Sequence, residues 1–201
     1  MGNFIKSEFK TTDTAAPVTR LTIAKALFNG ADSATLPNTD IGGYAWNYRA
    51  GAWNVKGAAL DSGDTTTFSP ADCTIDPGKL NGVVSAKVLA IGAASLAGLY
   101  FRGLADGTGY VYYARGTDHV LAKRAGSNYT VIAQTGTARA FTSGEKLRVE
   151  FTGSRIICSV DGVVSHDVTD TTYATGTRVG VHTRLATLAN PARWDDFLLT
   201  E

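Results

Sequence analysis

The sequence predicts an all-β fold, in which two antiparallel sheets pack face to face behind an extended N-terminal arm. From Gly98 to Gly176, glycines recur at intervals of about ten residues, the spacing of a strand and its turn in a β-sandwich. The segments between them are rich in Val, Ile, Tyr, Phe and Thr, which favour strands. The only stretch with helical character, Thr22 to Leu27, is too short to form a helix alone, and we expect it to be extended.

Two neighbouring segments, 146–152 and 155–161, show the clearest alternation of apolar and polar residues. Such alternation places the apolar side chains of a strand on one face of its sheet. We expect a hairpin closed at Thr152–Ser154, followed by a tight turn at Asp161–Gly162, because Asp and Gly tolerate the left-handed backbone of short turns. The residues expected to face the core are Leu147, Val149, Phe151, Ile156, Cys158 and Val160.

The chain has 201 residues, of which 44% are hydrophobic, and we expect one domain over residues 21–201 behind a polar arm of residues 1–20. A chain of this size buries roughly 70% of its extended surface, so it needs no disulfide or metal to hold its core. The arm carries Phe4, Ile5 and Phe9, which have no local core to enter. It is either a frayed terminus or an anchor that orders against a neighbouring subunit.

Charge and hydropathy exclude several classes of partner. The formal net charge is +1, which argues against a nucleic-acid partner and against a polybasic membrane anchor. The first twenty residues lack the apolar core of a signal peptide, and the apolar stretch Val83 to Leu99 is too interrupted to span a membrane. We expect Cys73 and Cys158 to be reduced, because Cys158 lies in an apolar run.

Two blocks carry a resemblance to a known family. The first, residues 27–60, contains an apolar pair, a small turn, an Asp, Gly42–Gly43 and then Trp46 and G-x-W-x-V. The second, residues 98–197, runs through GLYFRG, GYVYYAR, LRVEFTGSRIICSVDG and TGTRVGVHT to ARWDDF. Together they resemble the concanavalin A-like, laminin G-like jelly rolls of bacteriophage tail and capsid appendages and of carbohydrate-binding proteins. Independently of the resemblance, Trp46 and Trp53 offer the large apolar area that the interior of a sandwich requires.

An enzymatic site is not expected. Glycoside hydrolases need two carboxylates flanking the scissile bond, and the strand signature Glu-x-Asp-x-x-Glu or Glu-x-Asp-x-Glu that such folds carry is absent. We expect Glu145 and Glu150 to be solvated. The three histidines, at 119, 166 and 182, match no triad or metal-binding spacing, and we expect them at strand edges or turns. Residues 103–109 read as a hairpin turn rather than a phosphate loop.

The last strand presents a conflict, because strict alternation would place either Asp195 or Asp196 on a largely apolar face. The resemblance suggests one solution, a structural calcium held by these two acids with help from Asp32. A buried Asp paired with Arg178 or Arg193 explains the sequence equally well. We therefore predict no cofactor and no metal, with calcium as the alternative.

For a lectin-like function, aromatic and polar side chains must share one open face. If the outward residues of two neighbouring strands share the concave sheet, a ligand-binding patch forms from Tyr100, Arg102, Tyr110 and Tyr112. In the alternative interpretation the tyrosines only cover the sandwich, with their hydroxyls reaching solvent.

These observations lead to one main hypothesis and two alternatives. The main hypothesis is a non-enzymatic accessory protein of a bacteriophage virion, a capsid decoration or tail appendage held to other virion proteins by its arm. It is expected to be a homo-oligomer made in the host cytoplasm without a signal peptide, to contact a cell-surface glycan, and to bind neither nucleic acid nor membranes. The alternatives are a carbohydrate-binding module and, more remotely, a glycoside hydrolase.

Overall fold

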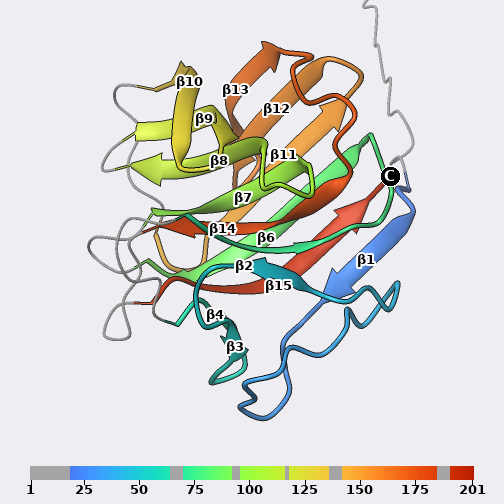
Figure 1. Cartoon of the computed structure of the whole chain (residues 1–201), viewed down its shortest axis with the longest axis vertical. Coiled ribbons are helices and arrows are strands. Elements are labelled where there is room, and N and C mark those ends of the chain that lie inside the picture. Colours follow the sequence, from blue (N-terminus) through green and yellow to red (C-terminus); the bar gives the residue numbers. More distant parts are fainter. Residues whose placement is uncertain (1–18, 64–69, 92–95, 116–117, 136–141, 185–190) are drawn as a thin grey trace, which may run out of the picture.

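The computed structural model describes residues 19–63, 70–91, 96–115, 118–135, 142–184 and 191–201, and within these ranges the chain forms strands, turns and loops but no helix. The strands make two antiparallel sheets that pack face to face (Figure 1). The predicted all-β sandwich is confirmed. In the described part of the chain, no helix offers the length and apolar character that a membrane span requires.

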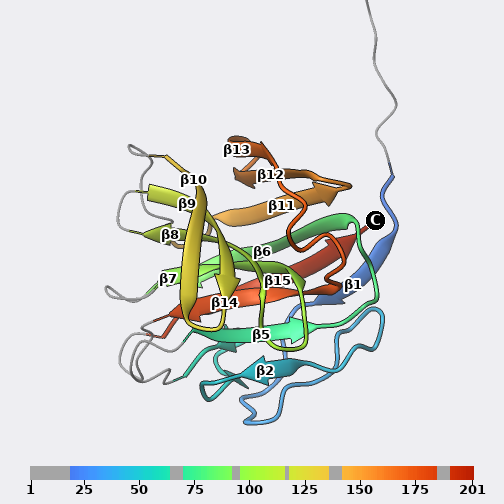
Figure 2. The ribbon, with the colours of Figure 1, turned by 45° about the horizontal axis from the view of Figure 1, so that its top comes forward.

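The chain crosses repeatedly between the two sheets, so that neighbours within a sheet are often distant in sequence. Figure 2 shows both series of strands: one descends from β13 at the top through β12, β11 and β6 to β15 near the middle, and the other descends from β10 to β2 at the bottom. In spatial order, sheet A contains β13 (Val163–Thr169), β12 (Arg155–Val160), β11 (Lys146–Thr152), β6 (Gly82–Ala90), β15 (Arg193–Thr200), β4 (Leu60–Asp61) and β3 (Asn54–Val55), with β1 (Thr22–Ala26) also paired to β15. Sheet B contains β10 (Asn128–Gln134), β9 (Asp118–Ala125), β8 (Gly109–Arg115), β7 (Leu96–Gly103), β14 (Arg178–Arg184), β5 (Ala71–Ile75) and β2 (Asn47–Arg49).

The first strand, β1, shows that the short segment at Thr22 is extended, as expected. It pairs with the last strand, β15, so the first and last strands of the sandwich are neighbours in sheet A. The arm residues Phe4, Ile5 and Phe9 lie outside the described residues.

The predicted hairpins of sheet A are confirmed. Thr152 of β11 pairs with Arg155 of β12, which leaves a two-residue turn between them. Val160 of β12 pairs with Val163 of β13 across Asp161–Gly162, whose φ angles of 48° and 81° both lie in the left-handed region. This is the backbone that two-residue hairpin turns require. The six apolar residues expected to face inward from β11 and β12 are all buried in the core.

Aromatic side chains fill the space between the sheets near the start of the domain. Trp53 packs against Trp194 with ring centroids 5.6 Å apart, and Trp46 meets Phe197 edge-on at 5.1 Å. All four side chains are buried, which confirms the expectation for Trp46 and Trp53. Both cysteines are free thiols buried in the same core.

A β-bulge in β15 removes the conflict seen in the sequence. The pairing of β15 with β6 shifts register between Asp195 and Leu198, and Asp196 adopts a φ of 51°. The extra residue lets Trp194 and Phe197 both face the core although they are three positions apart. Asp195 is half-buried and Asp196 exposed, outside that core. The expectation that one of the two acids sits on the apolar face is therefore wrong.

Gly42 permits a tight crossing of the chain over β1. Its φ is 89°, and a Cβ placed there would lie 2.5 Å from the carbonyl oxygen of Ile23. The next residue, Gly43, also has a positive φ of 64°, but a Cβ there would meet no atom within 4 Å. Both glycines thus have a left-handed backbone, but only Gly42 lies so close to other atoms that a Cβ would not fit.

We expect Gly43→Ala to lower the free energy of unfolding by about 1 kcal/mol, the cost of a left-handed alanine. Gly42→Ala should cost clearly more, because its methyl group would also overlap backbone atoms that cannot move aside. Urea unfolding of both variants measures the difference. Equal costs would show that the crossing at Gly42 is looser than described.

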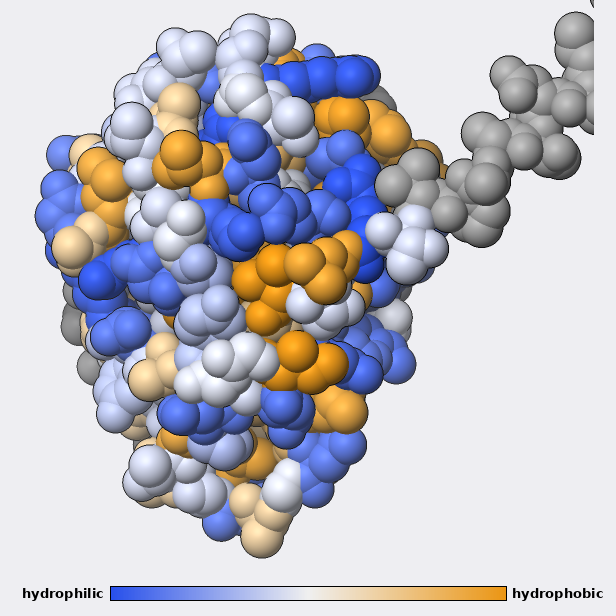
Figure 3. Space-filling model, turned by 90° about the vertical axis from the view of Figure 1, so that its right-hand side faces the viewer, coloured by the Kyte–Doolittle hydropathy of each residue, from blue (hydrophilic) through white to orange (hydrophobic). Residues whose placement is uncertain are grey.

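Exposed apolar side chains are scattered over the described surface. On the face shown in Figure 3 they form several separate groups among hydrophilic residues. The most exposed large ones include Val163 and Val164 on the edge strand β13, Leu21 before β1, and Tyr48 on the edge strand β2. Of these, Tyr48 lies beside a pocket.

Candidate functional site

A pocket of about 400 Å³ opens on the outer face of sheet B, the face turned away from the core. This volume is within the range of small-molecule sites. Two tyrosines contribute to it, Tyr48 at the exposed edge of the sheet and Tyr100 on the central strand β7. Its polar lining comes from Asn47, Arg49, Asp72, Thr74, Asp106 and Arg178.

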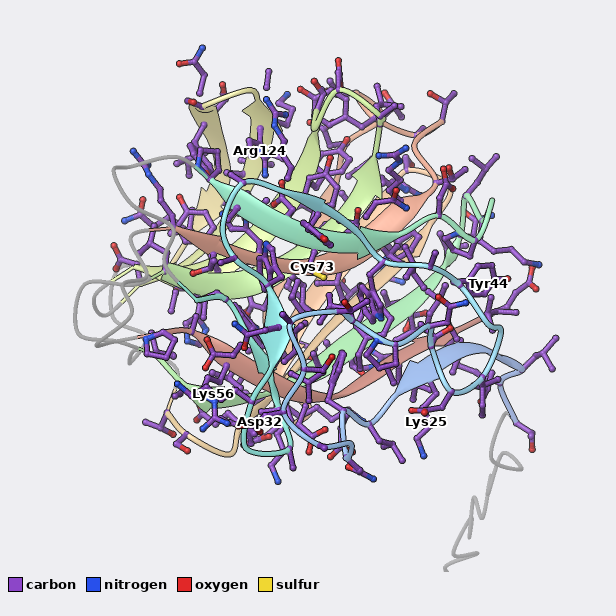
Figure 4. The ribbon with its side chains drawn as sticks, turned by 60° about the horizontal axis from the view of Figure 1, so that its bottom comes forward. Lys25, Asp32, Tyr44, Lys56, Cys73 and Arg124 are labelled. Atoms are coloured by element: carbon purple, nitrogen blue, oxygen red, sulfur yellow. The ribbon has the colours of Figure 1, made fainter. Side chains whose placement is uncertain are left out.

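Strand alternation in β5 explains why polar side chains line this face. Ala71, Cys73 and Ile75 point into the core, so Asp72 and Thr74 point outward. Figure 4 shows both sides of the sheet, with Cys73 in the middle of the sandwich and Arg124 beyond sheet B. The edge strand β2 continues the outer face, because Asn47 pairs with Thr74 and Arg49 pairs with Asp72.

The turn between β7 and β8 forms one wall of the pocket and confirms the predicted hairpin at residues 103–109. The turn is held by Asp106, whose Oδ1 accepts a hydrogen bond from the Thr108 amide at 2.8 Å. Arg49 reaches across from β2 and donates from Nη1 to the carbonyl oxygen of Asp106. Tyr100 donates from its hydroxyl to the carbonyl oxygen of Thr108 at 2.8 Å. The wall is therefore fixed to both the edge and the centre of the sheet.

Asp72 forms the centre of a buried polar network beside the pocket. Arg124 Nη1 donates to both carboxylate oxygens at 2.5 Å, and His182 Nδ1 lies 2.8 Å from Asp72 Oδ1. The Tyr129 hydroxyl lies 3.2 Å from His182 Nε2, and the Arg124 guanidinium lies 5.3 Å from the ring centroid of Tyr100. Because an ionised carboxylate only accepts, His182 carries its proton on Nδ1 and accepts from Tyr129 at Nε2.

Burial and charge set the protonation states in this network. Burial alone would raise the pKa of Asp72, but the hydrogen bond from His182 and the charge and hydrogen bonds of Arg124 leave that pKa below its ordinary value. Burial lowers the pKa of His182, and its bond to Asp72 offsets this only in part. Asp72 is thus ionised and His182 neutral at pH 7, a state that is compatible with the hydrogen bonds among Asp72, Arg124, His182 and Tyr129.

We expect the free energy of unfolding to fall as the pH drops below about 6.5, the ordinary value for histidine. The pKa values of His182 and His166 are lowered in the folded protein, chiefly by burial. As the pH falls, the unfolded chain therefore binds protons before the folded chain does. Once the pH is below both the folded and the unfolded pKa of a histidine, each pH unit between these two values reduces the free energy of unfolding by about 1.4 kcal/mol. Urea midpoints between pH 8 and pH 5 test this, with His182→Gln as the variant whose pH dependence should be shallower. A flat profile would contradict the assignment.

The four residues predicted to bind ligand do not share one face. Tyr100 lies on the outer face of sheet B, whereas Tyr110 and Tyr112 of β8 point into the sandwich, where both are 0% exposed. Tyr110 donates to Asp170 at 2.5 Å, so these hydroxyls do not reach solvent either. The prediction of a surface patch is therefore wrong. Both faces of β8 are apolar, and the face that carries Tyr110 and Tyr112 packs into the core.

Arg102 also leaves the expected face. Its φ is 47°, and the pairing of β7 with β14 shifts register at this point. The guanidinium lies 5.5 Å from the ring centroid of Phe151 in sheet A and donates to the carbonyl oxygen of Gly153. The local change of twist thus carries Arg102 from the outer face of sheet B into the end of the sandwich.

The expectation that Glu145 is solvated is wrong. Glu145 is only 4% exposed, and its Oε2 accepts from the Thr142 amide at 2.6 Å. All three histidines are buried within strands; His166 lies on the edge strand β13, whereas His119 and His182 lie on inner strands rather than at edges or turns. His166 Nε2, for example, lies 2.9 Å from the carbonyl oxygen of His119, between the sheets. Glu150, in contrast, is half-buried and forms ion pairs with Arg20 and Arg148.

The acids considered for calcium have separate roles. Asp32 Oδ1 accepts from the Gly57 amide at 2.7 Å, and Asp195 Oδ1 accepts from the Asp196 amide at 2.8 Å. In the described ranges, no three His, Cys, Asp or Glu side chains converge on a point where they could hold a metal. The two arginines proposed as alternative partners lie near other acids, Arg193 beside Asp61 at 3.5 Å and Arg178 beside Asp76 at 3.6 Å.

Two carboxylates belong to the described lining of the pocket, Asp72 and Asp106. The hydrogen bond from Thr108 lowers the pKa of Asp106, and the pKa of Asp72 is lowered too. A general acid for glycoside hydrolysis needs a raised pKa, which neither group has. The remaining polar lining offers guanidinium, amide and hydroxyl groups.

Comparison with known proteins places the fold. No family model matches the chain, and no curated protein matches it in sequence. Carbohydrate-binding module CBM66 from Bacillus subtilis has a TM-score of 0.55 and 16% identity, covering 78% of this chain and 91% of that chain. The exoplasmic/lumenal domain of VIP36, in a form bound to Ca²⁺ and Man3GlcNAc, has a TM-score of 0.56 and 14% identity, covering 77% of this chain and 82% of that chain.

An enzyme shares the fold as well. SCLam, a non-specific endo-β-1,3(4)-glucanase from family GH16, has a TM-score of 0.61 and 10% identity, covering 93% of both chains. At such low identities these similarities show the fold alone. The chain has a galectin-like, concanavalin A-like jelly roll, a fold that serves both carbohydrate-binding domains and a glucanase.

Proposed function

We propose that the protein is a non-enzymatic carbohydrate-binding domain and that the pocket on the outer face of sheet B is its binding site. The observation that carries the proposal is the set of planar polar groups that this pocket gathers on one face of the sheet. Asn47 and Arg49 are exposed on the edge strand β2, and their pairing with Thr74 and Asp72 places these four side chains on the outer face. Sugars present directional hydroxyl groups, which such a set of side chains can match.

The similar folds support this class of ligand. CBM66 is described as a carbohydrate-binding module, and Emp46p contributes a carbohydrate recognition domain with a TM-score of 0.58. The endo-glucanase SCLam supports the alternative of a hydrolase. The lowered pKa values of Asp72 and Asp106 favour binding without hydrolysis, since neither carboxyl group would hold a proton at neutral pH.

A glycan array followed by titration calorimetry tests the proposal. Asn47→Ala should weaken the affinity for the array's strongest ligand at least about tenfold, which corresponds to about 1.4 kcal/mol. The Asn47 side chain is exposed, so the thermal unfolding temperature should change little. Arg148→Ala, on the outer face of sheet A, is the control and should bind as the wild type does. Unchanged affinity in Asn47→Ala would refute the assignment of this site.

Hydrolysis is tested separately with the same ligand. A reducing-end assay over a day at neutral pH should detect no cleavage of a glycan that the domain binds. Cleavage that is lost in Asp72→Asn or Asp106→Asn, with binding retained, would favour the hydrolase alternative.

The expected place on a bacteriophage particle remains a prediction, as does the homo-oligomer. Its assembly residues Phe4, Ile5 and Phe9 lie outside the described residues. Deleting residues 1–20 separates this hypothesis from glycan binding. Loss of particle association with the sandwich still folded would support an anchoring arm, whereas glycan binding should survive the deletion because every residue of the pocket lies within the sandwich.

A further inference from the structure

We infer that the ligand of this pocket is an anionic saccharide, one that carries a carboxylate or a sulfate group. The inference rests on the proposed function and specifies its ligand class. Its basis is an excess of unused hydrogen-bond donors over unused acceptors on the charged groups of the site.

The acidic groups of the site are already occupied. Both oxygens of Asp72 accept from Arg124, and Oδ1 also faces His182. One oxygen of Asp106 is engaged by the Thr108 amide. Little carboxylate capacity is therefore left to receive the hydroxyl donors of a neutral sugar.

The basic groups, in contrast, keep free donors. Arg49 donates only from Nη1, to a carbonyl oxygen, and Arg178 has a single long contact of 3.6 Å from Nε to Asp76. Among the described residues, the terminal nitrogens of Arg178 have no hydrogen-bond partner, although Arg178 lines the pocket. Arginine retains its charge at any physiological pH and offers a planar fork of donors that matches a carboxylate or a sulfate.

A buried guanidinium adds to this excess. Arg124 is 0% exposed, and its Nη2 has no partner among the described residues. Both Arg124 Nη2 and Arg49 Nη1 approach Gly107 in the pocket wall, the former 3.0 Å from where a Cβ of that residue would lie. Two guanidinium groups thus converge beside the pocket, where an anionic group would find unmatched donors. The charges of the lining balance, Arg49 and Arg178 against Asp72 and Asp106, so the inference rests on these donors and not on net charge.

The test compares saccharides that differ only in charge. Calorimetry with trigalacturonate and its fully methyl-esterified form supplies the carboxylate arm, and chondroitin sulfate tetrasaccharide with its unsulfated form supplies the sulfate arm. We expect the wild type to bind at least one acidic member at least about tenfold more tightly than its less charged counterpart. That affinity should fall with rising salt. Whichever arm shows the preference identifies the acidic group.

Variants then connect the preference with the arginines. Arg49→Gln and Arg178→Gln should each weaken binding of the preferred acidic member at least about tenfold more than binding of its counterpart. Arg178→Lys, which keeps the charge but loses the fork, should lose less. Arg148→Gln is the control outside the pocket, and circular dichroism confirms that each variant is folded.

Equal affinity for the charged and less charged members, or an acid preference that survives both glutamine variants, would overturn the inference. In that case binding that still depends on Asn47 would leave the proposed function standing. If no saccharide of either kind binds, in these arms or on the array, the proposed function fails together with the inference.

Discussion

Replacing Arg124 with alanine is expected to lower the free energy of unfolding by about 3–5 kcal/mol, because it leaves the carboxylate of Asp72 buried without its main partner. Asp72 is only 4% exposed, so water cannot replace the lost guanidinium. The variant also removes the cation–π contact with Tyr100. Chemical denaturation at pH 7.5 measures the change.

A double variant separates the effect of the unpaired buried carboxylate from the effect of the lost side-chain packing. In Asp72→Asn/Arg124→Met the buried carboxylate is gone, and Asn can still accept the proton of His182 Nδ1. The double variant should therefore be more stable than Arg124→Ala alone. The matched control is Arg155→Ala, which breaks an exposed ion pair with Asp167 and should cost less than about 1 kcal/mol. An Arg124→Ala cost as small as that control would contradict the account of the network.

Trp194→Ala is expected to destabilise the fold by a similar amount, about 3–5 kcal/mol, through the cavity that it leaves. Trp194 is 0% exposed and packs against Trp53 across the core. Tyr48→Ala removes an aromatic side chain that is 56% exposed, and should change stability by no more than about 0.5 kcal/mol. Comparable losses in the two variants would mean that Trp194 does not occupy the described position in the core.

Local sequence pattern was sufficient where one face of a strand is plainly apolar. In β11 each apolar residue alternates with a polar one, and in β12 only Ile157 interrupts the pattern, so the inward face and the turn at Asp161–Gly162 follow directly. In β8 this rule gives no answer, because Tyr110 and Tyr112 alternate with Val111 and Tyr113 and both faces are apolar. The choice between them depends on packing across the sandwich, which a single strand does not encode.

Bulges within strands are a second reason why the faces predicted from the sequence differ from those in the structure. At Arg102 and at Asp196 a non-glycine residue adopts a positive φ and reverses the alternation that follows. Glycine would have marked such a position, whereas Arg and Asp do not. The bulge in β15 did leave one trace in the sequence, since Trp194 and Phe197 are both large and apolar but stand three positions apart.

The pocket could not be predicted from the sequence because its residues come from distant segments of the chain. Arg49, Asp72 and Arg178 lie on β2, β5 and β14, which become neighbours only through the order of strands in sheet B. One signal was present, a single Asp between the apolar residues of the ADCTI segment. An isolated acid within an otherwise buried strand requires a partner, and here that partner, Arg124, lies 52 positions away.

The position of a bound glycan tests the central claim most directly. A crystal structure of the full chain with the strongest ligand from the array should show the sugar in the pocket of sheet B, within hydrogen-bonding distance of Asn47 and of Arg49 or Arg178. A glycan seated instead on the outer face of sheet A, or along the edge strands β10 and β13, would contradict the assignment of this pocket as the binding site.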